Sequence, residues 1–593
     1  MSRSAPHRER LDRLRARLRQ AGVDGFYLPR TDRHGNEFLP PSEERVAYLT
    51  GFTGSFAVLA VLQDGAALFT DGRYRLQARE EVDGSLFEIH EVPAHEPERW
   101  LAERTPSGGR IGFDPYLVSR RTRDRLARAL AAKDAVPVAL ADNPVDAVWH
   151  ERPAPPRERA FWLPISYAGE PCAAKCRRVG ERIAELGAEW LLITRPDALC
   201  WLLNLRGGDI PFNPLVLGFG LLHRSGRLRW FVDAAKLPAE PPPEGVEVAP
   251  YEELAAALEA IGEAAVAADP GLVHLGFLEH IKAGGARLVE VDDPILALKA
   301  VKNPIEAEGM RRSQIRDGRA VIRFLHWLDG LPLDGSVSEW DLAERLAQER
   351  SQDPLFLGPS FPSIVAHGPN GAVVHYRTEP ARARPITAGT LLLVDSGAHY
   401  LDGTTDITRT VALGEPSREM RERFTAVLEG HISLARLRVP KGTRGVQIDA
   451  FARKALWDLG LDYDHGTGHG VGHVLCVHET PPRLAKRGAE AELLAGMVFS
   501  NEPGYYREGA YGIRIENLML VHAEEAAGGE RPMLGFETLT LVPIDRRLIL
   551  PERLSPEARA WLDSYHARVL EVQGPELEEP VRTWLEQACA PLG

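Results

Sequence analysis

The chain has 593 residues, of which 44% are hydrophobic and 26% charged, and its formal net charge is -13. This length predicts several domains, and the composition is typical of a folded globular protein rather than a disordered or fibrous one. The acidic balance argues against binding to nucleic acid or to an anionic membrane, because phosphate contacts need a basic face. We therefore expect neither among the partners.

The cysteines and the first residues indicate a cytoplasmic protein. Five cysteines in so long a chain make no disulfide framework, which favours a reducing compartment. The Arg-rich start contains Glu9 and Asp12 and no apolar core, so it predicts a helix rather than a targeting segment. No run of about 18 apolar residues occurs, so no membrane span is expected.

The N-terminal half contains a repeated pattern. Leucines at helical spacing between residues 8 and 20 precede a short predicted strand. The pattern returns where 178–197 (RVGERIAELGAEWLLITRPD) echoes 13–32 (RLRARLRQAGVDGFYLPRTD). Each copy later has a predicted strand that ends in aspartate, Asp71 in the first and Asp233 in the second. We infer a duplicated α/β unit, that is, two homologous N-terminal domains.

Two local signals mark the domain boundaries. The proline-rich stretch from Pro144 to Pro164 resists both helix and strand. Further on, Asn303 can cap a helix, Pro304 suits its first position and Glu306 complements its N-terminus. A long helix should follow, to about residue 331. The predicted domains are 1–155, 156–302 and 303–593, the last with a C-terminal extension over about 550–593.

The third domain combines predicted strands with helices between about 418 and 458, which indicates an α+β class. Its segment LLLVDSGAHYLDGTTDITRT places Asp395 and Asp406 in two strands joined by a turn. Adjacent antiparallel strands would bring both carboxylates together. Aspartate also ends strands and caps turns for structural reasons alone, so neither residue indicates a site by itself.

Histidines and further carboxylates follow in glycine-rich surroundings. For a lone histidine a structural role is the usual interpretation, and we keep it for His473. Glu502 follows an apolar strand in FSNEPGYY, and in GIRIENLML Arg514 and Glu516 lie two apart, hence on one strand face. The segment HGTGHGVGHVLCVHE contains His465, His469, His473 and His478.

The charges of these residues predict a metal site. Four ionised carboxylates in one pocket would repel each other, whereas two divalent cations balance them and His469 supplies a nitrogen ligand. Carboxylate-rich ligation favours Mn(II), with Zn, Co and Fe left open by affinity alone. The carboxylates concerned are Asp395, Asp406, Glu502 and Glu516.

The motifs occur in a specific order along almost the whole chain: TDGRY, NLRGGDIPFNP, GPNGAVVHY, VDSGAHYLDGTTDITRT, HGTGHGVG, VHE, NEPGYY and GIRIEN. This set resembles the creatinase/prolidase/methionine-aminopeptidase superfamily, specifically its three-domain Xaa-Pro aminopeptidase subgroup. The resemblance implies two creatinase-N-like α/β domains, a pita-bread catalytic domain and a homodimer. It also implies that the five metal ligands are Asp395, Asp406, His469, Glu502 and Glu516.

The resemblance assigns further roles. It implies that Glu502 is also the general base, and that Arg73 contacts substrate from the N-terminal domain. Thr480 stands where such proteins more often have glycine after VHE, which leaves the shape of that loop open. The implied substrate-orienting and proton-shuttling histidines are His375, His465 and His478. Substrate is further expected to contact His469 and, in the proline pocket, Tyr506 and Arg514.

The function implied is removal of the N-terminal residue from peptides with proline in second position. A prolidase-type Xaa-Pro dipeptidase is the nearest alternative, although prolidases usually carry one N-terminal domain. Creatinase is disfavoured because that hydrolase lacks the ligand set. A catalytically silent peptide-binding protein of the same fold is the alternative from another class.

Overall fold

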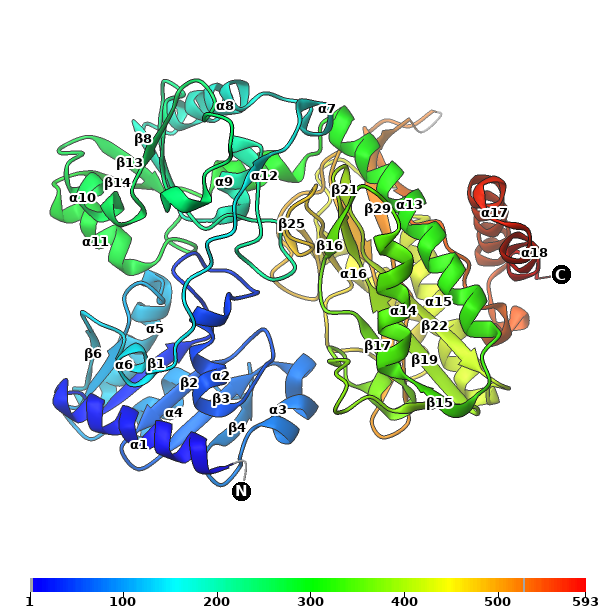
Figure 1. The fold of residues 1–593 in the computed structure, drawn as a ribbon, viewed down its shortest axis with the longest axis horizontal. Helices are drawn as coiled ribbons and strands as arrows, with labels where there is room; N and C mark the ends of the chain where they lie inside the picture. The colour runs from blue at the N-terminus through cyan, green and yellow to red at the C-terminus, as the bar shows by residue number, and fades with distance from the viewer. Residues whose placement is uncertain (1–3, 526–527, 593) are drawn as a thin grey trace. The chain divides into compact units, whose positions relative to one another are not determined.

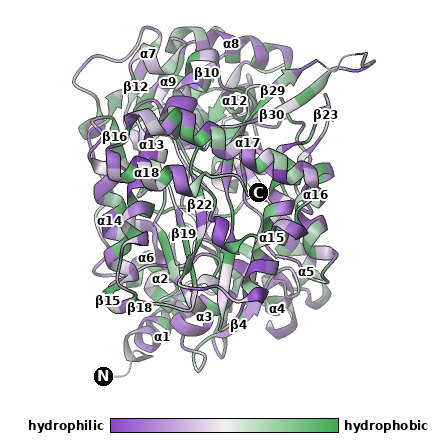
Figure 2. Cartoon of the chain, turned by 90° about the vertical axis from the view of Figure 1, so that its right-hand side faces the viewer, coloured by the Kyte–Doolittle hydropathy of each residue, from purple (hydrophilic) through white to green (hydrophobic). Residues whose placement is uncertain are grey.

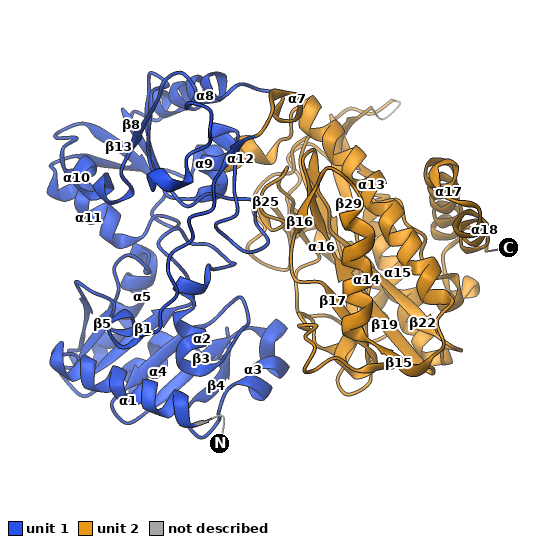
Figure 3. Ribbon diagram, viewed as in Figure 1, with its two compact units in different colours: residues 1–162, 170–295 blue, residues 163–169, 296–593 orange. Residues whose placement is uncertain are grey.

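The structure is a computed structural model in which residues 4–525 and 528–592 are described. Contacts divide the chain into two compact units (Figure 3). The first comprises residues 1–162 and 170–295, and the second comprises 163–169 and 296–593. Both expected N-terminal domains therefore fall largely in unit 1, and the expected metal site lies entirely in unit 2.

The first half of unit 1 is a six-stranded sheet with the order β4-β3-β2-β1-β5-β6. β1 pairs antiparallel with β2 and parallel with β5. The expected leucine stripe of the first helix is buried. The strands are β1 Gly25–Pro29, β2 Val58–Leu62, β3 Ala66–Thr70, β4 Glu88–Glu91, β5 Arg110–Phe113 and β6 Val136–Ala139. The helices are α1 Ser4–Gln20, α2 Arg45–Thr50, α3 Arg75–Glu81, α4 Pro97–Arg104, α5 Arg120–Leu130 and α6 Pro144–Val148.

The second half of unit 1 repeats this sheet, with the order β12-β11-β10-β8-β13-β14. β8 pairs antiparallel with β10 and parallel with β13, as β1 does with β2 and β5. The strands are β7 Phe161–Trp162, β8 Trp190–Ile193, β9 Leu205–Arg206, β10 Phe219–His223, β11 Leu228–Phe231, β12 Val246–Ala249, β13 Ala265–Ala268 and β14 Arg287–Glu290. The helices are α8 Cys172–Glu185, α9 Pro196–Leu203, α10 Leu254–Glu259 and α11 Leu275–Ala283.

The duplication inferred from sequence is thus confirmed, down to a local detail. Asp71 and Asp233 each follow the equivalent strand and cap a 3-10 helix, accepting hydrogen bonds from the N–H groups of Arg73 and Ala235. Between the copies, residues 152–160 form neither helix nor strand, as their prolines predict. The prediction is wrong at both ends of the proline-rich stretch: Pro144 takes the first position of α6, where it needs no N–H, and β7 occupies Phe161–Trp162.

Unit 2 combines long helices with antiparallel sheets (Figure 1). The expected long helix is α13, Pro304–Asp329, and it begins with a capping box in which Asn303 and Glu306 bond each other's backbone N–H groups. The helices expected between about 418 and 458 are α15 Arg418–Ala435 and α16 Gly445–Trp457. The other helices named here are α7 Ile165–Ala168, α12 Pro294–Ala300, α14 Glu339–Ser351, α17 Pro556–Gln573 and α18 Glu579–Ala588.

Two sheets in unit 2 supply the site, with the orders β17-β19-β22 and β23-β30-β29-β26-β24-β25. Every residue of β22 is buried, so this strand lies inside the domain rather than on its surface. The strands of unit 2, in these two sheets and in smaller ones, are β15 Asp334–Ser338, β16 Phe356–Pro359, β17 Ile364–His367, β18 Pro385–Thr387, β19 Thr390–Ser396, β20 Ala398–Tyr400, β21 Gly403–Thr404, β22 Ile407–Leu413, β23 Val439–Pro440, β24 Gly468–Gly470, β25 Glu479–Leu484, β26 Val498–Asn501, β27 Gly504–Arg507, β28 Tyr511–Arg514, β29 Asn517–Glu524 and β30 Met533–Thr538.

Helices α15 and α17 carry hydrophobic and hydrophilic residues mixed together in Figure 2. Such mixing is expected of helices that bury one side and expose the other.

In the described part of the chain, no helix combines the length and the apolar character that crossing a membrane requires. The mixed α/β class predicted from sequence is confirmed.

Candidate metal centre

Asp395 lies in β19 and Asp406 directly before β22, so neighbouring antiparallel strands place the two residues, as the sequence predicts. β19 pairs with β22 in a register that sets Asp395 opposite Thr408. Asp406 directly precedes β22, and both aspartates are buried. The apolar and β-branched residues that bury this hairpin therefore carry two carboxylates into the interior of unit 2.

His469 lies in β24, which approaches β26 closely. A side chain at Gly468 would meet the Ser500 carbonyl oxygen at 1.8 Å, so only glycine allows this approach. His469 Nδ1 donates to the Gly470 carbonyl oxygen at 2.8 Å, so Nε2 is the nitrogen that the ring can offer to a cation. Nε2 lies 3.5 Å from Asp406 Oδ2 and 3.4 Å from Glu502 Oε1. A candidate nitrogen ligand thus faces two carboxylates.

Glu516 is held by the hairpin that carries the aspartates. Its N–H donates to the Thr408 carbonyl oxygen at 3.1 Å, and the Thr408 hydroxyl donates to Glu516 Oε2 at 2.8 Å. The prediction that Arg514 and Glu516 share one strand face is wrong, because β28 ends at Arg514 and β29 begins at Asn517. The backbone between them bonds to Pro503 and Thr408 instead, which redirects the chain.

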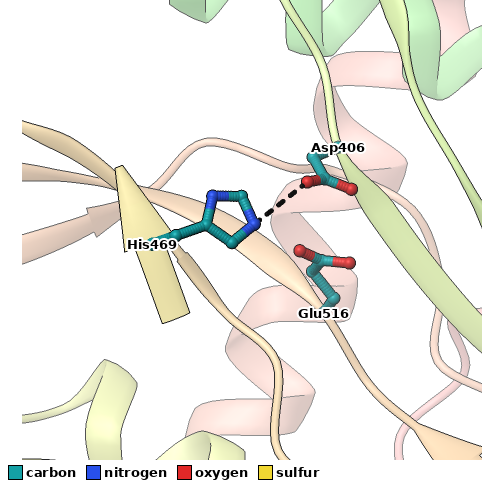
Figure 4. Close-up of side chains that lie close together, drawn as sticks. All are labelled: Asp406, His469 and Glu516. Atoms are coloured by element: carbon teal, nitrogen blue, oxygen red, sulfur yellow. Dashed lines mark ion pairs between the residues drawn. The ribbon is translucent and has the colours of Figure 1, made fainter. Parts of the chain in front are cut away.

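Figure 4 shows the side chains of Asp406, His469 and Glu516 turned toward one another. One potential ligand atom from each lies within 4.8 Å of the others, a spacing that a single cation can bridge. Glu502 joins this group through its contact with His469. Asp395 joins through charge, because its carboxylate raises the pKa of both Asp406 and Glu516.

The electrostatics of the group favour a cation. Burial, followed by repulsion from neighbouring carboxylates, raises the pKa of Asp406 and Glu516 well above the usual range. Burial also raises the pKa of Glu502, to about 7. The buried oxygens Asp395 Oδ1 and Asp406 Oδ1 have no hydrogen-bond partner among the described residues. Divalent cations would both neutralise this charge and coordinate these oxygens, so the residues fit the predicted metal.

A chain of hydrogen bonds runs from Asp395 to His465. Arg514 Nη2 donates to Asp395 Oδ2 at 2.6 Å, and its Nη1 donates to the Tyr506 hydroxyl at 2.5 Å. The Tyr506 hydroxyl in turn donates to His465 Nε2 at 2.8 Å, since His465 Nδ1 donates to the Gly466 carbonyl oxygen. Burial raises the pKa of Tyr506 to about 12, which keeps its proton in place. Four predicted residues, Asp395, Arg514, Tyr506 and His465, thus form one continuous network.

The remaining predicted residues have different surroundings. The ring of His478 lies 4.4 Å from that of His469 and is almost perpendicular to it. His375 is half-buried in the segment between β17 and β18. His473 Nε2 lies 3.0 Å from the Asp402 carbonyl oxygen, which agrees with its structural interpretation. Arg73 belongs to unit 1, where its guanidinium donates to Asp71 at 2.8 and 3.0 Å.

Four family models match the chain in series. The model of metallopeptidase family M24 matches residues 308–523, and that of the C-terminal region of peptidase_M24 matches 532–592. Two models of the creatinase/prolidase N-terminal domain match 10–146 and 151–306.

Relatives match along the whole length. A probable Xaa-Pro aminopeptidase P of Laccaria bicolor is 38% identical over 98% of this chain and 93% of its own. Aminopeptidase P2 of Arabidopsis thaliana is 37% identical over 96% of this chain and 86% of its own. This chain belongs to metallopeptidase family M24.

Two solved structures are also similar to this chain. The crystal structure of X-prolyl aminopeptidase from Caenorhabditis elegans, described as a cytosolic enzyme with a di-nuclear active site, is 33% identical with a TM-score of 0.93. The match covers 99% of this chain and 100% of that one. Prolidase from Pyrococcus horikoshii OT3, 23% identical with a TM-score of 0.50, covers 62% of this chain and 99% of its own and indicates shared fold alone. The predicted family and the order of its domain types are confirmed.

The M24 site also depends on residues that the sequence reasoning missed. Thr408 bonds Glu516 as described, and the Ser500 hydroxyl donates to Glu502 Oε1 at 3.1 Å. Arg409 is buried, and its guanidinium donates to the Glu516 carbonyl oxygen at 2.7 Å and to the Tyr565 hydroxyl of α17 at 3.0 Å. Thr408 and Arg409 lie inside TTDITRT, so the motif contained the signal, but only the register shows which atoms they bond.

Proposed function

We propose that this protein is an Xaa-Pro aminopeptidase that removes the N-terminal residue from peptides with proline in the second position. The observation that carries the proposal is the convergence of Asp406, His469 and Glu516 on one point inside a chain whose full-length relatives are named Xaa-Pro aminopeptidases. Peptides of this kind are the proposed substrates.

The proposed ligands hold two divalent cations, in agreement with the di-nuclear active site described for the Caenorhabditis elegans enzyme. We propose Mn(II) as the native ion, because oxygen ligands outnumber nitrogen ligands in the set. The ligands are Asp395, Asp406, His469, Glu502 and Glu516.

When bound, the cations supply Lewis-acid polarisation of the scissile carbonyl and lower the pKa of the attacking water. Glu502 accepts a proton and passes it to the proline nitrogen that leaves. His478 or His375 donates a hydrogen bond to the carbonyl oxygen as negative charge develops on it. His465 and His469 orient the substrate beside them.

Arg514 and Tyr506 line the pocket for the proline ring, each fixed by the hydrogen bonds described above. A peptide bond to proline is a tertiary amide with no N–H, so a peptidase cannot recognise it through that donor. Selection by the shape of a ring pocket avoids this difficulty. Arg73 is proposed as an additional substrate contact from the N-terminal domain.

The decisive experiment compares Arg-Pro-Pro with Arg-Ala-Pro, using protein treated with chelator and then assayed with and without added Mn(II). Cleavage of Arg-Pro-Pro alone, and only with metal, is expected. Cleavage of Arg-Ala-Pro at a similar rate would contradict the specificity. Preference for the dipeptide Arg-Pro over Arg-Pro-Pro would identify a prolidase-type dipeptidase instead, and binding of Arg-Pro-Pro without cleavage would identify a silent peptide-binding protein.

We also propose a homodimer in the cytoplasm, with domain boundaries at 155/156 and 302/303. The description of the Caenorhabditis elegans enzyme as cytosolic supports the location. Size-exclusion chromatography with light scattering would test the dimer, because a mass near 65.4 kDa would identify a monomer instead. Limited proteolysis followed by mass spectrometry would test the boundaries.

A further inference from the structure

A fully buried glutamate, Glu339, lies at the first position of helix α14 and bonds a single segment of the chain. Its side chain is 0% exposed. Oε1 accepts from the His367 N–H at 2.6 Å and from the Asn370 side-chain amide at 2.9 Å. Oε2 accepts from the Tyr376 hydroxyl and from the Arg384 N–H, both at 2.8 Å. All four donors lie between residues 367 and 384, which we call the His375 segment.

The His375 segment has little regular structure of its own. After a 3-10 helix over Gly368–Ala372, no helix or strand occurs until β18. Such a segment has no hydrogen-bond ladder to fix its path, so side-chain contacts must supply that restraint. Glu339 supplies it at four points, and its own N–H donates to the Arg384 carbonyl oxygen at 2.9 Å, which closes the attachment.

Both chain neighbours of His375 are held. The Val374 carbonyl oxygen accepts from Arg514 Nη2 at 3.3 Å, the same guanidinium that bonds Asp395. On the other side, the Tyr376 hydroxyl donates to Glu339. The backbone of His375 is therefore fixed between a group of the metal centre and the buried carboxylate.

The segment also lies tightly against β28, the strand that ends at Arg514. A side chain at Gly371 would come within 2.8 Å of the Gly512 nitrogen, so the two backbones touch directly. Tyr376 is buried with Ile364 and Leu393 in a small apolar cluster. Glu339 is the charged end of this arrangement, and a buried carboxylate is stable only while its oxygens are hydrogen-bonded. The carboxylate and the segment thus hold each other in place.

We infer that Glu339 is a positioning residue for catalysis, which holds the His375 segment so that the imidazole of His375 meets the scissile carbonyl. The inference rests on the role of His375 in the proposed function. Glu339 itself does not contact substrate. Its effect on the reaction passes entirely through His375.

A double-mutant cycle tests this dependence on Arg-Pro-Pro cleavage. His375→Ala and Glu339→Gln are each expected to lower kcat about 100-fold, the loss that a displaced reacting group causes, with KM changed less than about threefold. Combined, they should be no worse than His375→Ala alone to within about twofold, because Glu339 then has nothing left to position. Bound metal, measured by mass spectrometry, should stay unchanged in all three.

Asp341→Asn is the matched control. Asp341 is an exposed acidic residue in the same first turn of α14, but its carboxylate bonds Ser338 and not the His375 segment. It should keep wild-type kcat. Should Glu339→Gln fail to fold, Tyr376→Phe replaces it in the cycle, since this change removes one hydroxyl and retains the ring.

The inference would be overturned if the two losses in kcat multiplied in the double variant, to about 10,000-fold. A wild-type kcat for Glu339→Gln would overturn it as well. A fully active His375→Ala enzyme would overturn the role of His375 and the inference with it. Failure of the proposed function has a different signature, because wild-type protein would then leave Arg-Pro-Pro uncleaved.

Discussion

Replacing Glu479 by glutamine is predicted to destabilise unit 2 by about 3–5 kcal/mol. Glu479 directly follows His478 and is 1% exposed at its side chain, and the ammonium groups beside it, on Lys299 and Lys302, are 0% exposed. Lys299 Nζ lies 2.7 Å from Oε2, and Lys302 bonds Oε1. Burial lowers the pKa of Lys302, and the Glu479 carboxylate opposes this shift.

The magnitude follows from the geometry of the pair. A contact of 2.7 Å corresponds to about 6 kcal/mol of attraction at an effective dielectric constant of about 20. Glutamine would remove the carboxylate that lies between two buried ammonium groups, which is the costly way to break a buried ion pair. Thermal scanning should show a fall of roughly 5–15 °C for the transition of this unit.

Two comparisons isolate the cause. Asp458→Asn removes the partner of Lys454 in an exposed pair and should leave the transition unchanged within error. Replacing Lys299, Lys302 and Glu479 together by methionine removes all three charges and should recover most of the loss, because apolar residues of similar volume replace buried ion pairs well. A shift below about 2 °C in Glu479→Gln, or a triple variant less stable than the single one, would refute the reasoning.

Three further predictions concern the metal centre and pH. Asp406→Ala and Glu516→Ala should each abolish Arg-Pro-Pro cleavage and lower bound metal measured by mass spectrometry, and a variant that keeps both would contradict the ligand set. Arg514→Lys should lower kcat/KM by about 10–100-fold, because lysine cannot bond Asp395 and the Tyr506 hydroxyl together; an unchanged value would contradict this role. Burial lowers the pKa of His431 and His566 from 6.5 to about 3 in the folded protein. Below pH 6.5 the unfolded chain therefore binds more protons than the folded one, and the free energy of unfolding decreases as the pH is lowered further. Each histidine contributes at most about 1.4 kcal/mol per pH unit to this pH dependence of stability. Denaturant titrations at pH 7, 6 and 5 should therefore show a smaller pH dependence for His566→Gln than for the wild-type protein.

Local chemistry made much of the fold predictable. The N-terminus of α13 depends on residues adjacent in sequence, Asn303, Pro304 and Glu306, and it begins where they indicate. The duplicated sheet was visible because each copy repeats the same pattern, from the helix to the aspartate that caps the next 3-10 helix. The hairpin of Asp395 and Asp406 was also a local inference.

Some errors and omissions concern places where contacts between residues far apart in sequence determine the structure. Arg514 and Glu516 were assigned to one strand because their spacing fits one, but backbone bonds to Pro503 and Thr408 break the strand between them. Glu339 precedes His375 by 36 positions, and a glutamate in the first turn of a helix is ordinary in sequence. Only the burial of its carboxylate distinguishes it. The proposed metal ligands could be predicted from the sequence, whereas the residues that orient them could not.

The supports have a common chemistry that bears on what the centre does. Thr408, Ser500 and the Gly470 carbonyl hold Glu516, Glu502 and His469 through neutral groups, and Arg514 is the cation that bonds Asp395. Neutral donors orient a carboxylate without neutralising it, so most of the negative charge of the centre is left for a ligand to balance. A centre stabilised by lysines would fold more easily and bind cations more weakly. Burial and the repulsion between carboxylates, which together raise the pKa of Asp406 and Glu516, are therefore also the reasons why divalent cations would bind at the proposed site.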